Sequence, residues 1–450
     1  MGKTEDDELL TAPPFTAIGG LAVPIALSSL LEQLYNMVDS IVAGNFLGEN
    51  AVAAVGASFS LCNVLVYAAI GCGIGAGVLA ARRFGEGARE KASAVIWTSV
   101  ALFTLTGTAI GIAGLPLAEC ILEALGTPTE ALGDSRAYLA VYFVGMPALF
   151  ALNTVTAMFN AIGDSRTPLI LLILSALINI CGDIAATATL GMGVAGIALS
   201  TVAAEYAAAV AGAAVLGKRT RGWRDGKKLL NTRLTAPIVR LAVPSVLQQA
   251  TIAIGLMLVQ SVVNGFGTAS LAGFSAAMRV ENVATVPTIA LGSALSTFAS
   301  QNVGAGRGDR AEQGYRASQR VVAVTSVTIC IVYQLFCGQL MSMFLGADAS
   351  VEAMGVGIAY MRFVGWCYAL IGLKNVADGM LRGLGDTRIF TCANVINLGL
   401  RVGLAHLLAP IFGVAATWWV VPIGWFTNFA ISHAGVAAWR TGKLKLPGAA

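Results

Sequence analysis

Long apolar runs alternate with short polar connections along the whole chain. Each run is long enough to cross a bilayer as a helix, since about 20 residues at 1.5 Å rise span a hydrocarbon core of ~30 Å. The runs fall near residues 16–45, 51–80, 92–117, 137–161, 168–188, 194–216, 237–265, 271–300, 317–341, 356–381, 389–409 and 412–438. This pattern predicts an all-α integral membrane protein with twelve transmembrane helices, and it leaves no room for a soluble domain.

The composition agrees with the apolar pattern. Of the 450 residues, 56% are hydrophobic and only 12% are charged, whereas soluble domains carry about 25% charged residues. The eight cysteines are scattered and the two histidines are far apart. We therefore expect neither a disulfide framework nor a metal site, and no cofactor apart from a coupling ion.

The charges predict the orientation in the membrane. With both termini on the cytoplasmic side, the inner connections and their flanks hold most of the 28 Lys and Arg residues. They include RRFGEGAREK at 82–91 and the basic stretch Lys218 to Arg233, while the outer connections are mostly acidic. This asymmetry is the one that the positive-inside rule demands. The basic stretch is therefore expected to be a cytoplasmic linker near anionic lipid, not a nucleic-acid-binding segment.

The two halves of the chain repeat one another. LAVP at 21–24 recurs at 241–244, FGEG at 84–87 matches VGAG at 303–306, and NAIGDSR at 160–166 matches RGLGDTR at 382–388. Six helices followed by six in the same orientation predict two homologous bundles, which is a transporter architecture. The expected parts are an N-terminal tail 1–15, a six-helix lobe 16–216, a basic linker 217–236, a second lobe 237–438 and a C-terminal tail 439–450.

The first apolar stretch, residues 21–46, carries polar groups that a simple membrane anchor would lack. Glu32, Tyr35 and Asp39 are spaced so that they share one helix face. A carboxylate at membrane depth costs about 2.5 kcal/mol or more by insertion scales, so it rarely faces lipid. A polar packing contact and a proton or ion site both fit, and we favour the site. Pro24 removes a backbone donor and predicts a bend near the start of this helix.

These features together resemble one family of transporters. The 6+6 repeat, Pro24 with YNMVD at 35–39, the paired GDSR and GDTR motifs, and FGEG with VGAG are similar to multidrug and toxic compound extrusion (MATE) transporters of the DNA-damage-inducible branch. The resemblance implies a V-shaped pair of six-helix bundles that open alternately to each side. It also implies export of amphipathic, often cationic compounds in exchange for inward H⁺ or Na⁺.

The resemblance further implies particular site residues. The matched positions are Pro24, Tyr35 and Asp39 in the first helix, Asn153 in the fourth, Asn179 and Asp183 in the fifth, and Thr201 in the sixth. The other large branch has a glutamate in its seventh helix. This chain offers only glutamines there, at Gln248, Gln249 and Gln260, so a cation site of that kind is not expected.

Asp39 and Asp183 are the expected proton- or cation-binding pair. If the first, fourth, fifth and sixth helices enclose a cavity, the two carboxyls come within hydrogen-bond reach. One of them should then keep a proton, because two desolvated carboxylates cannot both ionise cheaply. A polar cluster would satisfy the charged form or ligate an ion, through Tyr35, Asn153, Asn179 and Thr201. The same oxygens suit Na⁺, so the coupling ion stays open between H⁺ and Na⁺.

The second half carries fewer acids within its spans. Glu281 and Asp378 are candidates for a C-terminal cavity, although Glu281 fits a packing role equally well. Lys374 and Asp378 are four residues apart on one helix, so they are expected to neutralise one another.

The predicted function is therefore secondary active multidrug efflux by alternating access. The alternative is a lipid or lipid-linked oligosaccharide flippase of the wider superfamily, which would line its cavity with basic residues. No HExxH or GxSxG motif is present, so an enzyme is not expected. The expected partners are small amphipathic substrates and the lipid bilayer. We expect a monomer in the cell inner membrane, with no nucleic acid bound.

Overall fold

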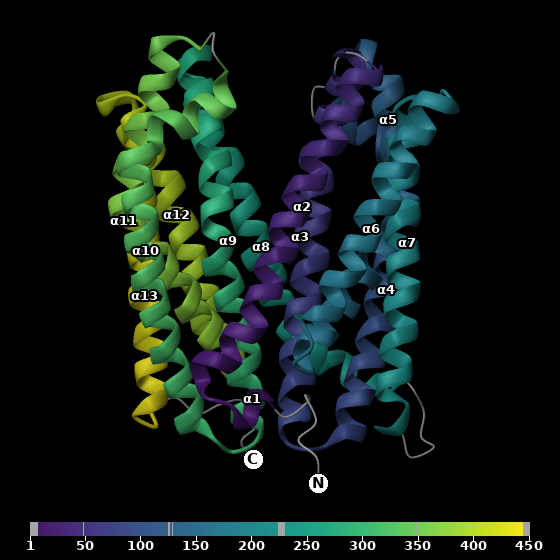
Figure 1. The fold of residues 1–450 in the computed structure, drawn as a ribbon, viewed down its shortest axis with the longest axis vertical. Coiled ribbons are helices and arrows are strands. Elements are labelled where there is room, and N and C mark those ends of the chain that lie inside the picture. Colours follow the sequence, from purple (N-terminus) through teal and green to yellow (C-terminus); the bar gives the residue numbers. More distant parts are fainter. Residues whose placement is uncertain are drawn as a thin grey trace. The chain divides into compact units, whose positions relative to one another are not determined.

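The computed structural model describes residues 8–47, 49–124, 127, 129–223, 230–346 and 349–443, and this part of the chain is helical without β-strands. A short helix, α1 (Glu8–Thr11), precedes the long helices (Figure 1). The long helices of the first half are α2 (Pro14–Leu47), α3 (Glu49–Gly85), α4 (Arg89–Ala124), α5 (Thr129–Ala161), α6 (Arg166–Ile184) and α7 (Gly193–Thr220). Those of the second half are α8 (Thr235–Asn264), α9 (Thr268–Gly304), α10 (Gly308–Leu345), α11 (Val351–Leu384), α12 (Thr387–Phe412) and α13 (Ala415–Arg440).

The predicted all-α fold with twelve transmembrane helices is confirmed. Among the described residues, 11 helices, α2 to α12, are long and apolar enough to cross a membrane. The remaining helix, α13, has 26 residues. Its sequence includes Trp418, Trp419 and Trp425 together with Asn428 and His433. These residues lower its mean hydropathy without shortening it.

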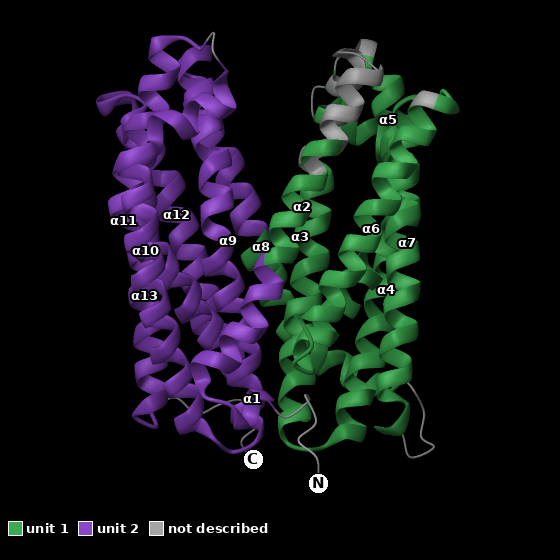
Figure 2. Ribbon diagram, viewed as in Figure 1, with its two compact units in different colours: residues 1–6, 27–249 green, residues 7–26, 250–450 purple. Residues whose placement is uncertain are grey.

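The helices divide into two compact units that differ from the expected lobes in two segments. Among the described residues, unit 1 lies within residues 27–249, and unit 2 holds residues 8–26 and those from 250 to 443 (Figure 2). The first part of α2 thus belongs to unit 2, and the first part of α8 belongs to unit 1. The repeated LAVP motif lies in these two exchanged segments.

Close packing explains both exchanges. In unit 1, a Cβ atom at Gly75 of α3 would lie 2.4 Å from the Cα atom of Ala242, so only glycine lets α8 approach. Gly71 makes the same kind of contact with Val246. This outcome agrees with the small-residue run GCGIGAG at 71–77, which favours close helix packing. In unit 2, buried residues of α1 and α2 pack into one apolar cluster with α9, α10 and α11, including Leu9, Ile18, Leu21, Leu291, Phe298 and Met380.

The two units repeat the same helix contacts. In unit 1, α3 packs on α5, α4 on α5, α5 on α7 and α6 on α7; in unit 2, α9 packs on α11, α10 on α11, α11 on α13 and α12 on α13. The turns repeat as well. Gly87 and Gly306 have φ values of 71° and 74°, a left-handed conformation that favours glycine. The internal repeat read from the sequence is therefore present in the helix packing.

The paired GDSR and GDTR motifs form the same turn in both units. Gly163 and Gly385 have positive φ, and each donates its N–H to the carbonyl three residues earlier. The aspartate that follows caps the next helix: Asp164 Oδ1 accepts from Thr167 N at 3.0 Å, and Asp386 Oδ1 accepts from Ile389 N at 2.9 Å. These motifs start helices α6 and α12, because the aspartate satisfies amide groups that have no partner in the first turn.

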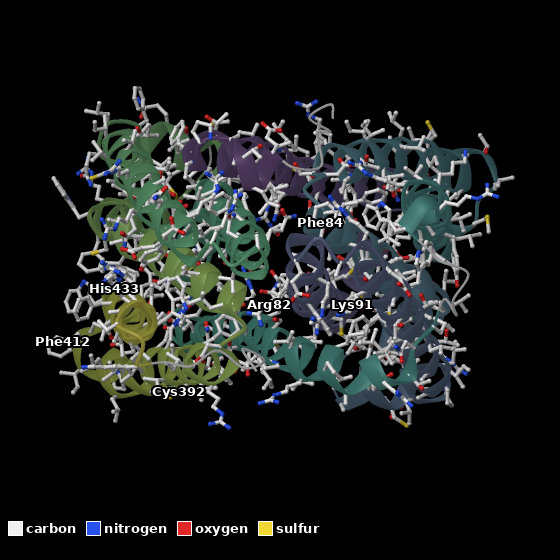
Figure 3. All side chains as sticks on the ribbon, turned by 90° about the horizontal axis from the view of Figure 1, so that it is seen from below. Arg82, Phe84, Lys91, Cys392, Phe412 and His433 are labelled. Atoms are coloured by element: carbon white, nitrogen blue, oxygen red, sulfur yellow. The ribbon has the colours of Figure 1, made fainter. Side chains whose placement is uncertain are left out.

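A basic and aromatic group surrounds the α3–α4 turn of unit 1. The guanidinium of Arg89 lies 3.5 Å from the ring centroid of Phe84 and 5.3 Å from that of Trp223, which follows α7. Arg82 and Lys91 flank the same turn (Figure 3). Cation–π contacts of this kind attach the start of the basic linker to the bundle.

Candidate functional site

Asp183 is held at the contact between α6 and α7 in unit 1. Its side chain is fully buried, and Ser200 of α7 donates its hydroxyl to Asp183 Oδ1. The neighbouring Gly182 makes this possible, because a Cβ atom there would lie 2.6 Å from the Cβ of Ser200. Thr187 donates to the main-chain carbonyl of Asp183 at 2.6 Å, which fixes the end of α6. The buried carboxylate is thus positioned by two helices.

Asn179 and Thr201 lie one turn away at the same contact. Asn179 Nδ2 donates to Thr201 Oγ1 at 3.0 Å, and Thr201 in turn donates to the carbonyl of Ile197 at 3.0 Å. Asn179 Oδ1 is buried and has no hydrogen-bond partner in the described part of the chain. The structure therefore brings together three of the predicted polar residues, Asn179, Asp183 and Thr201. They leave one buried carbonyl oxygen that could accept from a protonated or cationic group.

For Asn153, Asp39 and Pro24, the structure shows no link to this contact among the described residues. Asn153 lies on α5, where its amide donates to the carbonyl of Leu149 at 2.9 Å. Asp39 is on α2, but its side chain lies outside the described residues, so its approach to Asp183 stays a prediction. Helix α2 continues through Pro24, and the predicted bend there also stays a prediction.

Two further carboxyls form a second acidic group in unit 1. Glu32 on α2 and Glu205 on α7 are partly buried, and they lie close enough to interact electrostatically. Glu205 follows Thr201 by one helical turn, so these two residues share one face of α7. The two glutamates come from helices far apart in the sequence. The spacing of Glu32 and Asp39 predicts that they share a helix face, but no local pattern predicts the electrostatic interaction of Glu32 with Glu205.

Tyrosine side chains accompany the Glu32–Glu205 pair. Tyr67 of α3 lies near Glu32, and Tyr142 of α5 lies near Glu205. Tyr142 also lies near the predicted site residue Tyr35 of α2. Aromatic faces and carboxylates both attract organic cations. This combination is therefore suited to a positively charged, amphipathic ligand.

In unit 2, Asp378 belongs to a saturated buried network. Lys374 Nζ lies 3.2 Å from Asp378 Oδ2, as expected from their spacing, and both side chains are buried. Ser432 of α13 donates to Asp378 Oδ1 at 2.7 Å, and Asn394 of α12 donates to Oδ2 at 3.3 Å. With both carboxylate oxygens engaged by a cation and two neutral donors, this geometry favours a structural role.

Glu281 is buried on α9 and accepts a hydrogen bond from the hydroxyl of Tyr360. Arg401 of α12 interacts electrostatically with it, and the ring of Trp418 meets that of Tyr360 edge-on at 5.8 Å. The place of Glu281 and Asp378 in a C-terminal cavity stays a prediction.

The comparisons with known proteins agree with this arrangement. The chain matches the model of the MatE family over residues 24–184 and 244–407, which cover corresponding parts of the two halves. It is 28% identical over 427 residues to the probable multidrug resistance protein YoeA of Bacillus subtilis, covering 91% of this chain and 90% of that protein. It is 24% identical over 416 residues to the DNA damage-inducible protein F of Escherichia coli, covering 89% and 87%.

A solved structure shares the fold over almost the whole chain. It is described as the outward-facing conformation of a multidrug resistance MATE family transporter of the MOP superfamily. The TM-score is 0.91 at 23% sequence identity, with 99% of this chain and 100% of that chain covered. At this level of identity the likeness concerns the fold.

Proposed function

Because this chain belongs to the MATE family of multi-pass membrane transporters, whose members are not enzymes, we propose that it exports amphipathic, often cationic compounds in exchange for inward H⁺. Na⁺ is the alternative coupling ion. The observation that carries this proposal is the buried polar contact of α6 with α7, where Ser200 donates to Asp183 and Asn179 donates to Thr201. Glu205 lies one turn beyond Thr201 on α7 and interacts electrostatically with Glu32. Carboxylates within membrane spans rarely serve lipid-facing surfaces and are usually part of a transport path.

The proposed exchange is a competition for carboxylates. An organic cation held by Glu32 and Glu205 offsets their repulsion, and protons that enter from outside offset it equally well. Asp183, together with Asp39, is the proposed proton or cation site. Tyr35, Asn153, Asn179 and Thr201 are the proposed polar neighbours. In alternating access, the organic cation and the proton would each favour the conformation that binds it more tightly. The shift between the inward-open and outward-open conformations depends on how much the affinity of each ligand differs between them.

The proposed setting is the cell inner membrane, with both termini cytoplasmic and the protein a monomer. The cytoplasmic position of the termini is supported by basic residues at helix ends, which form ion pairs within each unit. Arg219 at the end of α7 pairs with Asp164 at the α5–α6 turn, and Arg440 at the end of α13 pairs with Glu312 at the start of α10 at 2.9 Å. These ends belong to the connections expected inside by the positive-inside rule.

The experiment that tests the proposal is ethidium transport in proteoliposomes, with proton and sodium gradients imposed separately. We expect a proton gradient to drive ethidium transport by the wild-type protein. Glu205→Gln should reduce the rate by about tenfold or more, since a buried charge contact to a ligand contributes about 1.5–3 kcal/mol. Glu312→Gln, which alters an acid at the α10 start, is the matched control. Equal rates for all three proteins would contradict the role of Glu205, and transport driven by sodium alone would assign the coupling ion to Na⁺.

A further inference from the structure

The repeated turn between α9 and α10 holds the start of the described chain in unit 2. Gly306 has a φ of 74° in this turn, and Arg307 donates its main-chain N–H to the carbonyl of Asn302 at 2.7 Å. The VGAG motif at 303–306 therefore places Asn302 and Arg307 on either side of one tight turn. Both side chains, and that of Arg310 in the first turn of α10, contact α1 or the residue after it.

The end of α1 is bound through its main-chain carbonyls. The last carbonyls of a helix have no partner within it. Here side chains of the α9–α10 turn donate to them in three hydrogen bonds: Asn302 to Leu9 at 3.2 Å, Arg307 to Leu10 at 2.8 Å, and Arg310 to Ala12. Two of the three donors are guanidinium groups, and charge-assisted hydrogen bonds are stronger than neutral ones. The side chain of Leu9 is also buried in the apolar cluster of unit 2, so α1 is firmly attached there.

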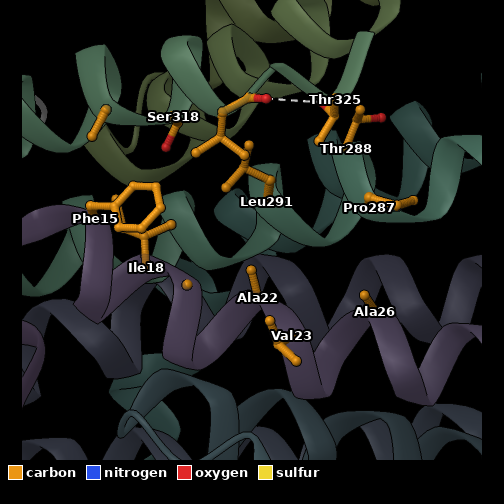
Figure 4. Close-up of a pocket in the computed structure, with 13 residues that line it drawn as sticks. Phe15, Ile18, Ala22, Val23, Ala26, Pro287, Thr288, Leu291, Ser318 and Thr325 are labelled. Atoms are coloured by element: carbon orange, nitrogen blue, oxygen red, sulfur yellow. Dashed lines mark hydrogen bonds between the residues drawn. The ribbon is translucent and has the colours of Figure 1, made fainter. Parts of the chain in front are cut away.

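The segment that follows α1 is packed less completely. A cavity of about 250 Å³ lies between the first part of α2 and helices α9 and α10 (Figure 4). It is lined by Ile18, Gly19 and Ala22 of α2, and by Leu291 and Val321 on the other side. Atoms that line a void lose their contacts on that side. Side-by-side packing therefore holds this part of α2 less tightly than a filled contact would, and the attachment through α1 matters more.

The segment before α8 is also attached, to α4 of unit 1, which corresponds to α10 of unit 2. The main-chain N–H of Asn231 donates to Thr98 Oγ1 at 3.1 Å, and Leu234 packs against the apolar core of unit 1. Helices α2 and α8 are the two whose first parts belong to the other unit. Each is thus preceded by a segment that is attached to the unit holding its first part.

We propose that α1 is a strap that keeps the first part of α2 with unit 2 throughout the transport cycle. The inference rests on the proposed function, since it concerns a transporter that alternates between two conformations. Helix α2 passes from unit 2 to unit 1 between Ala26 and Leu27. With its start fixed by α1, the helix carries a movement of one unit to the other. With its start free, the first part of α2 shifts on unit 2 and the movement is lost.

The attachment itself can be measured without transport. In a background without the native cysteines, Ala17→Cys is a reporter, because Ala17 is 2% exposed in the apolar cluster of unit 2. We expect N-ethylmaleimide to modify it slowly, and about tenfold faster when Arg307→Gln and Arg310→Gln are added, a ratio that corresponds to about 1.4 kcal/mol. Arg316→Gln is the matched control, since Arg316 of α10 pairs with Glu312 on its own helix.

A reversible crosslink tests whether the strap must stay attached. Leu10→Cys and Arg307→Cys, combined with Arg310→Gln, remove both guanidinium contacts and allow a bifunctional methanethiosulfonate to join α1 to the turn. In proteoliposomes with a proton gradient, we expect ethidium transport about tenfold slower than wild type before crosslinking, at equal ethidium binding. Crosslinking should restore the rate, and dithiothreitol should abolish the recovery.

Wild-type transport rates in the Arg307→Gln/Arg310→Gln protein would overturn the proposal. A crosslinked protein that binds ethidium but does not transport it would also overturn it, because the strap would then have to detach in each cycle. This second result does not depend on whether the glutamine variants fold. Equal labelling of Ala17→Cys in the double variant and in Arg316→Gln would disprove the attachment, even if ethidium proved not to be a substrate.

Discussion

At Asp183, the hydroxyl of Ser200 completes the site that α6 and α7 build. It donates directly to the buried carboxylate, while Gly182 provides the space for the two helices to approach. The spacing of Asn179 and Asp183 in the sequence predicts their shared face. Ser200 is one of many small residues in α7, and nothing in its local pattern distinguishes it from a packing residue.

Ser200→Ala should therefore weaken both the fold and transport. Losing a hydrogen bond to a buried charged group costs about 1–3 kcal/mol, so we expect a lower Tm and slower ethidium transport at an equal amount of inserted protein. The control is Ser261→Ala, since Ser261 is exposed and its hydroxyl donates to the carbonyl of Leu258 on its own helix. Identical Tm values and rates for the two variants would show that Ser200 is only a packing residue.

The Lys374–Asp378 pair should behave as a structural unit. Removing one partner of a buried ion pair costs about 3–5 kcal/mol, whereas neutralising both costs less. We therefore expect Lys374→Met to lower the Tm more than the double variant Lys374→Met/Asp378→Asn. Thermal unfolding monitored by size-exclusion chromatography measures this difference. A double variant less stable than Lys374→Met would mean that the pair contributes net stability.

At the scale of helices, the apolar runs predict the twelve transmembrane helices, and the paired motifs predict the internal repeat. Their boundaries followed from turns that only a few residues can make, such as those at Gly163 and Gly385. Contacts between helices far apart in the sequence could not be predicted: the electrostatic interaction of Glu32 on α2 with Glu205 on α7 depends on the folding of residues 27–249 into one unit. The assignment of the first parts of α2 and α8 to the other unit could not be predicted either, because it depends on tertiary contacts. For α8 these are the contacts at Gly71 and Gly75.

Gly75→Val tests the contact of α3 with α8. A Cβ atom at Gly75 would lie 2.4 Å from the Cα of Ala242 and 2.4 Å from the carbonyl oxygen of Leu241. Overpacking of this kind typically costs about 1–3 kcal/mol, so the Tm should fall. Gly56→Val on the same helix is the control, because a Cβ atom there meets nothing within 4 Å. Equal stability of the two variants would argue against the α3–α8 contact.

At the scale of the whole molecule, the orientation in the membrane can be tested with two open positions. Gly133 at the start of α5 and Gly222 after α7 both have space for a side chain. In a background without the native cysteines, an impermeant thiol reagent should label Gly133→Cys in intact cells. It should label Gly222→Cys only after permeabilisation, because the linker is expected inside. Labelling of Gly222→Cys in intact cells would reverse the orientation.

The most direct test of the central claim is proton release when ethidium is added to the purified protein. In the proposed mechanism, the acids of unit 1 exchange the cation for protons, and Asp378 has a structural role. Wild-type protein and Asp378→Asn that remains folded should release protons, whereas Asp183→Asn and Glu205→Gln should release fewer at the same ethidium occupancy. Release lost in Asp378→Asn but intact in both unit 1 variants would contradict the account.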